Sequence, residues 1–250
     1  VKKCSDELEM VLGYTKRKEE HVQKFTENIA HQIKTPLAGL SLLLDVIREE
    51  IPQEQMIQND IAQCFLHVDR IKEFIRQLLT ISRIEAGKVR FIKEPVSISG
   101  LFENVRQAVQ TDCKLTFDCA DKDAQIYADG QWITEALINL VENACRAARA
   151  AQQMQEQPEV KIVAVVHADK CVIKVVDNGN GFADGDTAHL FDRFETQGDY
   201  ASFQTGIGLN LSRLVVEAHS GTIQAYNRQD GQGAVFRVVL PQFVLKQGKI

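Results

Sequence analysis

The chain has 250 residues, of which 44% are hydrophobic and 25% are charged, and its formal net charge is −5. This composition is ordinary for a folded globular protein, and the length is sufficient for one large domain or two small ones. The negative charge argues against a nucleic-acid-binding protein, which would present a broad basic face. The longest apolar run, LAGLSLLLDVI, is interrupted by Asp45 and is too short to span a bilayer.

Two further features concern the cellular setting. The six cysteines are scattered, and no pair has the spacing of a metal site or a redox motif. We therefore expect reduced thiols in a cytosolic protein, with disulfides as the alternative. No signal peptide is recognised, and because the chain begins at Val1 we expect it to be a piece of a longer protein.

Apolar spacing in the first 86 residues predicts two long helices. The first series recurs at intervals of four and three residues and comprises Ile33, Leu37, Leu40, Leu44, Ile47 and Ile51. After a break imposed by Pro52, the second series shows the same alternation and comprises Ile57, Ile61, Cys64, Val68, Ile71, Ile75 and Leu78. Two such helices form an antiparallel all-α hairpin over residues 25–86. Pairing two hairpins into a four-helix bundle would bury both seams, so we expect a homodimer; the alternative is a monomeric hairpin packed on the second half.

The second half of the chain has a mixed pattern. A linker over residues 87–94, where Gly87 can form a left-handed helix cap, leads into it. Short strands are favoured at 114–119 and 124–129, a helix at 131–151, a β-hairpin at 159–169 and 171–179, a helix at 209–220, and strands at 221–227 and 233–241. Residues 95–245 are therefore predicted to form an α+β two-layer sandwich, a mixed sheet with helices on one face.

Two glycine-containing stretches follow strands in this second half. In VVDNGNGF (175–182), Asp177 ends a strand and can accept a hydrogen bond from an exocyclic amine, while Gly179 and Gly181 let a ligand approach the backbone. The alternative is a plain tight turn. In TGIGLNL (205–211), Gly206 and Gly208 precede a helix whose first N–H groups can bind a phosphate, although glycines near a helix start are common without any ligand.

The helical stretch LINLVENA carries two asparagines that share one face. Asn139 and Asn143 are four residues apart, and amides among leucines and alanines need partners. An amide oxygen can ligate a hard cation such as Mg²⁺, which keeps waters and phosphates in its shell. The alternative is a surface asparagine pair. One turn further, Arg146 can reach a phosphate or remain a solvated charge.

Along the chain, the asparagine helix comes first, the Asp177 turn second and the glycine turn before a helix third. In that order the three motifs resemble the ATP-binding domain of a bacterial sensor histidine kinase, within the superfamily of gyrase, chaperone and mismatch-repair ATPases. NLVENA resembles the N box, DNGNGF the G1 box, LFDRFET (190–196) the F box and TGIGLNL the G2 box, and GAVFRVVLP (233–241) resembles the last strand. The resemblance covers nearly all of residues 20–241.

The resemblance implies roles for individual residues. It implies that Asn143 coordinates Mg²⁺, that Asn139 lines the same site and that Asp177 bonds the adenine amine of ATP. The other implied ATP-binding positions are Arg146, Gly179, Gly181, Gly206, Gly208 and Leu209. Residues 183–205 would form a mobile lid that ATP orders and that Phe191 and Phe194 anchor.

Two departures from the family pattern, and one difference from the related ATPases, carry consequences. Asn210 replaces the third glycine of the G2 box, and Ala147 replaces a tyrosine that often follows the N box; we expect both to weaken nucleotide affinity without abolishing it. Related ATPases have a glutamate where this chain has Asn139, and an amide cannot accept a proton at neutral pH. Hydrolysis by water should therefore be slow, so the γ-phosphate needs another nucleophile.

The stretch FTENIAHQIKTPLAGL resembles the family's H box, which implies that His31 is the phosphoacceptor. The heptad register places His31 on an outer flank of the bundle, and an imidazole is nucleophilic near neutral pH. Pro36 weakens the helix beside it. Gln32 replaces the usual acidic residue and is expected to orient the imidazole, and the resemblance gives Thr35 a phosphatase role. The alternative is an ordinary exposed histidine beside a tolerated kink.

These observations predict the cytoplasmic core of a sensor histidine kinase. It would use ATP and Mg²⁺, phosphorylate itself on His31 and pass the phosphoryl group to an aspartate of a response regulator. Residues 1–24 would be a helical lead-in from an absent sensor segment, and absent segments would anchor the parent protein in the cell membrane. One alternative is a non-catalytic, ATP-binding dimer scaffold. Another is a hydrolysing ATPase, which Asn139 disfavours.

Overall fold

The computed structural model describes residues 33–34, 37–42, 44–45, 55–121, 123–151, 157–182, 187–192, 207–229 and 231–242. The chain divides into two compact units, residues 1–90 and 91–250, and each is described by itself. In the part of the chain so described, no helix is both long and apolar enough to cross a membrane.

The first unit is helical. Helix α2 (Gln55–Glu85) is preceded by described residues between 33 and 45 that are also helical. Leu37, Val68 and Ile75 form a buried apolar cluster, against which Leu44, Phe74 and Leu79 pack. The side chains of Ile33, Leu40 and Ile71, three members of the predicted seams, are 39%, 49% and 43% exposed. A single chain therefore covers its heptad positions only in part, and the predicted turn near Pro52 lies outside the described residues.

Helix α2 ends in a Schellman cap. Gly87 has a φ of +64°, its N–H donates to the Ile84 carbonyl at 2.9 Å, and the Lys88 N–H donates to the Arg83 carbonyl at 2.9 Å. These are the two bonds that satisfy the last carbonyls of a helix when a left-handed residue follows it. The left-handed cap predicted at Gly87 is confirmed.

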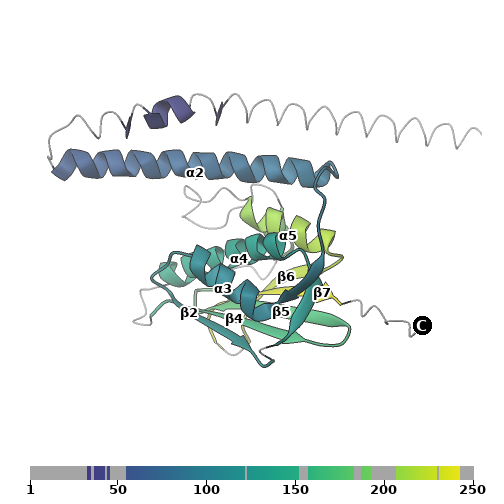
Figure 1. The fold of residues 1–250 in the computed structure, drawn as a ribbon. Coiled ribbons are helices and arrows are strands. Elements are labelled where there is room, and N and C mark those ends of the chain that lie inside the picture. Colours follow the sequence, from purple (N-terminus) through teal and green to yellow (C-terminus); the bar gives the residue numbers. More distant parts are fainter. Residues whose placement is uncertain are drawn as a thin grey trace, which may run out of the picture. The chain divides into compact units, whose positions relative to one another are not determined.

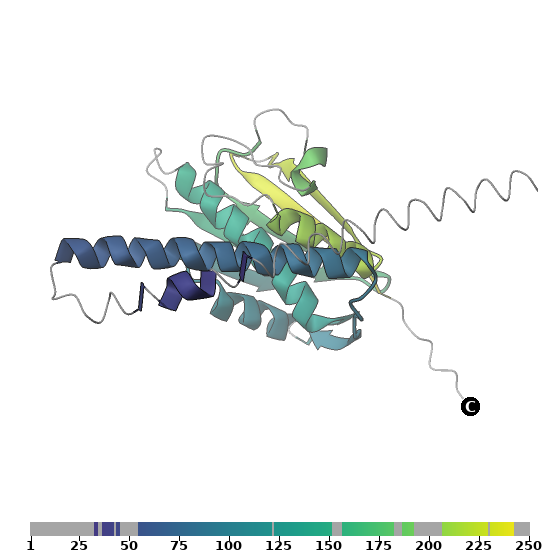
Figure 2. The ribbon, with the colours of Figure 1, turned by 90° about the horizontal axis from the view of Figure 1, so that it is seen from above.

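The second unit is a two-layer α+β sandwich, as predicted (Figure 1). Its five-stranded sheet has the order β2 (Lys114–Cys119), β4 (Glu159–Val166), β5 (Lys170–Asp177), β7 (Ala234–Pro241) and β6 (Thr222–Asn227). The β2–β4 pair is parallel and the other pairs are antiparallel, so the sheet is mixed. Helices α3 (Ile98–Ala108), α4 (Gly130–Ala150) and α5 (Gly208–Ala218) cover one face, and Figures 1 and 2 both place α4 beside α5.

Four elements differ from the expectation or were missed. The strand expected at 124–129 forms as β3 (Gln125–Ala128), but it pairs with β1 (Glu94–Ser97) in a separate two-stranded sheet. The sequence-based interpretation gave no helix at 98–108, although α3 has an amphipathic pattern: Ile98, Leu101, Phe102 and Val105 are all buried. The Ser97 hydroxyl caps this helix by accepting from the Gly100 N–H at 3.1 Å. A short 3₁₀ helix, η2 (Ala188–Phe191), also forms.

Alternation along β5 explains why a carboxylate is buried at its end. Successive side chains of a strand point to opposite faces, and Cys171, Ile173 and Val175 are fully buried. Asp177 continues this series and is only 1% exposed. The strand period therefore points the carboxylate into the interior at the point where the chain leaves the sheet.

Candidate active site

Asp177 is the most strongly constrained polar residue of the site. Its Oδ1 accepts from the Gly179 N–H at 2.9 Å and from the Ala234 N–H, across the strand pair, at 3.1 Å. Its Oδ2 is buried and has no partner among the described residues. Burial raises the pKa of the carboxyl, although the two backbone hydrogen bonds and the charge of Arg228 act in the opposite direction. One acceptor is thus held in place by the backbone, and the other remains available to a ligand that donates a hydrogen bond.

Two glycines allow the backbone to pack tightly around this carboxylate. A Cβ on Gly179 would lie 2.9 Å from the main-chain oxygen of Ala147, so only a glycine fits between this turn and α4. Gly233 has a φ of +121°, and a Cβ there would overlap the main-chain oxygen of Asp177. Gly233 was not among the predicted site residues; its position directly before the last strand was the available signal.

Asparagine side chains fix the turn that follows Asp177. Asn227 accepts from the Phe182 N–H at 2.6 Å and donates to the Phe182 carbonyl at 2.8 Å. Asn178 donates to the Gln157 carbonyl at 3.0 Å and accepts from the Glu159 N–H at 2.9 Å. Neither role was predicted, because each depends on strands that are distant in sequence. The turn around Gly179 and Gly181 is therefore held at both ends by side-chain bonds.

Helix α4 supplies the predicted asparagine pair. Asn139 is 6% exposed and its Nδ2 is buried without a partner among the described residues, so the surface-pair alternative is wrong for Asn139. The Asn143 amide donates to the Asn139 carbonyl at 2.8 Å, which orients its Oδ1 to accept from Arg146 Nη1 at 3.0 Å. One amide oxygen on this helix is thus directed to a cationic partner.

The start of α5 lies against Asn139. A Cβ on Gly208 would be 3.0 Å from Asn139 Oδ1, and α5 begins without a side-chain cap. Leu209 follows in the first turn and is partly exposed, while Ile207 before it is buried. Uncapped N–H groups and the positive end of the helix dipole are the ordinary features of a phosphate site.

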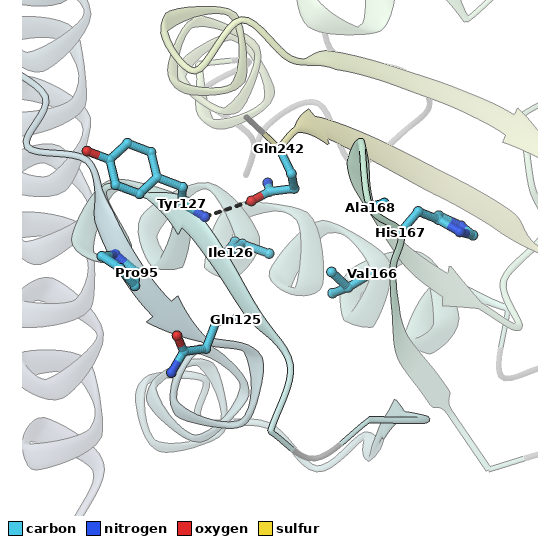
Figure 3. A pocket seen from close by; sticks show the side chains of 8 residues that line it. All are labelled: Pro95, Gln125, Ile126, Tyr127, Val166, His167, Ala168 and Gln242. Carbon is cyan, nitrogen blue, oxygen red and sulfur yellow. Dashed lines mark hydrogen bonds between the residues drawn. The ribbon is translucent and has the colours of Figure 1, made fainter. Parts of the chain in front are cut away.

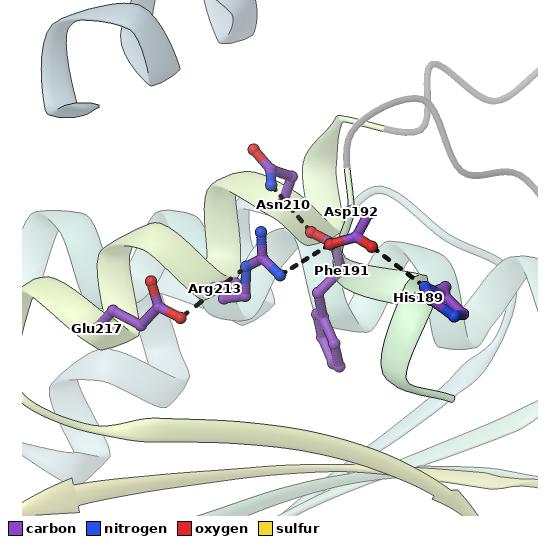
Figure 4. A network of polar contacts seen from close by, with 6 residues as sticks. All are labelled: His189, Phe191, Asp192, Asn210, Arg213 and Glu217. Carbon is purple, nitrogen blue, oxygen red and sulfur yellow. Dashed lines mark hydrogen bonds and ion pairs between the residues drawn. The ribbon is translucent and has the colours of Figure 1, made fainter. Parts of the chain in front are cut away.

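A polar network ties the F-box segment to α5 (Figure 4). The Asn210 amide donates to the Phe191 carbonyl at 2.9 Å, and Arg213 Nη1 donates to Asp192 Oδ1 at 3.0 Å. The hydrogen bond from His189, followed by that from Arg213, lowers the pKa of Asp192. Asn210, which stands at the third glycine position of the G2 box, is only 2% exposed. Its buried side chain therefore connects the segment around Phe191 to α5.

The structure thus brings several predicted residues together around α4. Gly179 packs on the backbone at Ala147, and Gly208 packs on Asn139, so the turn after β5 and the start of α5 both adjoin this helix. The predicted positions His31, Gln32, Thr35 and Gly206 lie outside the described residues. Among all the residues that the structure describes, no group of three or more His, Cys, Asp or Glu side chains could hold a metal ion.

A separate pocket of about 280 Å³ lies away from these residues (Figure 3). It is lined by Pro95, Gln125, Ile126, Tyr127, Val166, His167, Ala168 and Gln242. Gln242 Oε1 accepts from the Tyr127 N–H at 2.7 Å and so replaces a strand partner at the edge of β3. None of the predicted site residues lines this pocket.

Comparison with protein families decides the identity. Residues 128–243 match the histidine kinase-, DNA gyrase B- and HSP90-like ATPase family, and residues 21–87 match the His Kinase A (phospho-acceptor) domain. The chain belongs to the sensor histidine kinases. The chain is 32% identical to the sensor protein KdpD of Escherichia coli strain K12 over 223 residues, which are 86% of this chain and 24% of that protein. It is 29% identical to the sensor protein kinase PmrB of Pseudomonas aeruginosa over 244 residues, which are 95% of this chain and 49% of that protein.

Solved structures agree with this fold. Full-length ShkA in complex with AMPPNP superposes on this chain with a TM-score of 0.71 at 20% identity, over 88% of this chain and 46% of that chain. The histidine kinase ThkA in complex with the response regulator protein TrrA has a TM-score of 0.60 at 21% identity, over 90% and 63% of the two chains. The chain spans less than half the length of the curated relatives KdpD and PmrB.

Proposed function

We propose that the chain is a kinase core that binds Mg-ATP and transfers the γ-phosphoryl group to His31. The observation that carries this proposal is the buried Oδ2 of Asp177, which lacks a partner among the described residues. It lies in an ATPase-family domain that follows a phosphoacceptor-family hairpin in the same chain. A buried acceptor of this kind is costly unless a ligand completes it.

The purine base would be selected by Asp177. When ionised, the carboxylate has no donor and can only accept hydrogen bonds. Its Oδ1 already accepts two. The exocyclic amine of adenine is a donor and satisfies Oδ2. The carbonyl that guanine carries at the same ring position is an acceptor and would repel it. Adenine is therefore favoured over guanine by a hydrogen bond that only one base can make.

The phosphates would lie at the start of α5. The N–H groups at Gly208 and Leu209 begin an uncapped helix, Gly206 belongs to the same family box, and the helix dipole favours an anion there. The Asn139 amide and Arg146 add donors from α4, while Gly179 and Gly181 shape the wall beside the nucleotide. This assignment accounts for the buried Asn139 Nδ2 without a described partner.

Mg²⁺ would be held by Asn143 Oδ1. The donor chemistry fits, because this cation prefers oxygen ligands and takes few from the protein, with waters and phosphates completing its shell. Arg146 Nη1 donates to the same oxygen at 3.0 Å, so the ion would share this acceptor with the guanidinium or displace its hydrogen bond. When bound, the ion supplies neutralisation of the phosphate charge.

Phosphoryl transfer would go to an imidazole nitrogen of His31. That nitrogen forms a bond to the γ-phosphorus while the bond to the bridging oxygen of ADP breaks, and the proton on the other ring nitrogen passes to solvent. Asn139 cannot accept a proton from water, so the competing hydrolysis lacks a base. Alignment and charge neutralisation then account for most of the catalysis.

The direct test is incubation with γ-labelled ATP. Protein-bound label that is stable in base and lost in acid indicates phosphohistidine, and His31→Ala should abolish it while nucleotide binding persists. Asn143→Ala should also remain unlabelled, through loss of the metal ligand. Label that persists in the His31→Ala protein would exclude His31 as the acceptor. Mixing the two variants restores label only if transfer occurs across a dimer.

Two neighbours of His31 have separable expected roles. We propose that Gln32 orients the imidazole, so Gln32→Glu should change the labelling rate without abolishing it; an unchanged rate would exclude that role. Thr35→Ala should keep the label on His31 but lose dephosphorylation of the phospho-aspartyl partner. Loss of both activities in Thr35→Ala would contradict the division.

The proposed partners follow from the family. The partly exposed seam residues Ile33, Leu40 and Ile71 support a homodimer through the helical hairpin, because a second copy would cover them. A response regulator would dock on the bundle below His31 and accept the phosphoryl group on an aspartate. We expect no nucleic-acid partner, a cytoplasmic location and membrane attachment only through segments outside this chain.

A non-catalytic scaffold is the second candidate. Gln32 in place of an acidic residue favours it, because a missing polarising carboxylate is one route to an inactive kinase. Such a protein would bind ATP yet remain unlabelled after incubation with γ-labelled ATP. Steady release of phosphate from unlabelled protein would instead indicate a hydrolysing ATPase.

A further inference from the structure

A compact polar and aromatic cluster joins the linker to the second unit at a point outside the candidate active site. We call it the linker joint: Phe91, Ile92, Asp129, Trp132 and His219. The Phe91 ring lies between two others, with centroid distances of 5.5 Å to Trp132 and 5.4 Å to His219. The edge-on approach to His219 and the tilted approach to Trp132 are favourable aromatic geometries.

Asp129 organises the hydrogen bonds of the joint. Its Oδ2 accepts from the Ile92 N–H at 2.8 Å, and its Oδ1 accepts from the Trp132 N–H at 3.3 Å as the N-cap of α4. In the β1–β3 ladder Glu94 is paired with Ala128, directly before this point. The carboxylate thus replaces the ladder acceptor where the chain turns from β3 into α4, and it holds the linker backbone to the helix start.

His219 completes the joint from the end of α5. Its Nδ1 bonds the Val215 carbonyl at 2.8 Å, so Nδ1 carries the proton and Nε2 accepts from the Asp129 N–H at 2.9 Å. The ring is 5% exposed, and burial lowers its pKa; nearby Lys93 acts in the same direction, while the Val215 bond and the Asp129 carboxylate oppose it. With the proton on Nδ1, Nε2 is the acceptor in this arrangement.

The joint lies at the far ends of the two helices that carry the candidate nucleotide site. Asp129 caps the start of α4, which carries Asn139 and Asn143 further along, and His219 caps the end of α5, which begins at Gly208. On the other side, only residues 88–90 separate the Gly87 cap of α2 from Phe91. Three described helices thus end or begin within a few residues of one cluster.

We propose that the linker joint positions the nucleotide domain for transfer, with Phe91 and His219 as positioning residues. They touch neither nucleotide nor phosphoacceptor. They fix the path of the linker against α4 and α5, and so restrict the orientations from which the γ-phosphate can meet the acceptor histidine. This role rests on the proposed function and adds to it a determinant of transfer that is separate from nucleotide binding.

The test compares transfer with binding in the full chain. Phe91→Ala removes the ring, and His219→Ala removes the acceptor, whereas His219→Gln retains a side-chain oxygen as acceptor. The first two variants should slow labelling of His31 by roughly 10- to 100-fold, the loss expected when reacting groups are misaligned by about 1 Å. Their affinity for a non-hydrolysable ATP analogue should stay within about twofold, because binding is separable from transfer. His219→Gln should recover most of the rate.

Trp132 provides an independent readout, since it is the one tryptophan of the chain. Phe91→Ala should shift its fluorescence emission to longer wavelength as the indole loses its ring neighbour. The control is Arg149→Ala, which breaks an exposed ion pair with Asp112 at the opposite end of α4 and should leave labelling and emission unchanged.

The outcomes separate the two proposals. Wild-type labelling rates in Phe91→Ala and His219→Ala would overturn the positioning role, as would a parallel loss of affinity and rate, which indicates a merely structural cluster. A wild-type protein that binds the analogue but takes up no label would overturn the proposed function, and the positioning role with it.

Discussion

The substitution Asp177→Asn tests how the site reads the base. Asparagine has nearly the same shape, and its Oδ1 can keep the hydrogen bonds from the Gly179 and Ala234 N–H groups. Its Nδ2, however, replaces the buried Oδ2. Because Nδ2 and the adenine amine are both donors, no hydrogen bond can form between them. A hydrogen bond to a charged group contributes about 1.5–3 kcal/mol, so ATP affinity should fall roughly 10- to 150-fold.

The same substitution should reverse the preference between two nucleotides. Inosine triphosphate carries a carbonyl where ATP carries the amine, and the amide introduced by Asp177→Asn could donate to it, whereas the wild-type carboxylate repels it. Equilibrium titrations of both proteins with both nucleotides measure the four affinities. An Asp177→Asn protein that is folded and binds ATP as tightly as the wild type would refute the reasoning, as would an unchanged ratio of the two affinities.

Stability without nucleotide is the control for this experiment. Burial raises the pKa of Asp177, so the folded state holds the proton more tightly than the unfolded chain, in which the pKa of the carboxyl is 3.8. The resulting stabilisation is complete below pH 3.8 and is lost as pH rises through the raised pKa of the folded state. Asp177→Asn should therefore be at least as stable as the wild type near pH 7 in thermal unfolding.

Three further predictions concern neighbouring features. Burial lowers the pKa of His219, so its contribution to the free energy of unfolding should be present above pH 6.5 and decline as pH falls from 6.5 towards the lowered pKa. Denaturant titrations at several pH values measure this decline, and His219→Gln should remove it. Asn210→Ala leaves the buried Phe191 carbonyl without its donor at 2.9 Å and should lower the free energy of unfolding by about 1–3 kcal/mol. Chemical denaturation measures this change, and an unchanged free energy would refute a stabilising role of the Asn210–Phe191 hydrogen bond. Gly233→Ala combines a φ of +121° with a main-chain clash and should destabilise by more than about 2 kcal/mol, whereas Gly39→Ala, where a Cβ meets nothing within 4 Å, should be neutral or mildly stabilising by the same assay.

The fold was predictable where periodicity is strong and local. The stretches that became α4, β4, β5 and β7 carry clear 3.6- or 2-residue patterns, and their observed bounds agree with the expected ranges within a few residues. Helix α3 was missed although Ser97 and the spacing from Ile98 to Val105 were visible, because its 11 residues form a short pattern directly after a predicted linker. The separate pairing of β3 was not predictable, since pairing partners depend on long-range packing.

The residues proposed for the site were chosen from the sequence by type and motif, whereas their supporting contacts could not be foreseen. Asp177, Gly179, Asn139 and Gly208 were identified from motif order, and the structure places them around α4. The roles of Asn227 and Gly233 came only with the structure, because both act on segments far away in sequence. Asn210 was expected only to weaken nucleotide affinity, whereas the structure gives it a partner that no local pattern reveals.

The incomplete hydrogen bonding at Asp177 Oδ2 and Asn139 Nδ2 among the described residues has a consequence for the protein in its cell. On the proposed function, ATP completes both groups and binds only the folded domain, so it stabilises the native state. At about 100 times its dissociation constant, a ligand that binds only the native state adds about 2.7 kcal/mol to stability. In the cell, this stabilisation would be present only while the ATP concentration exceeds the dissociation constant.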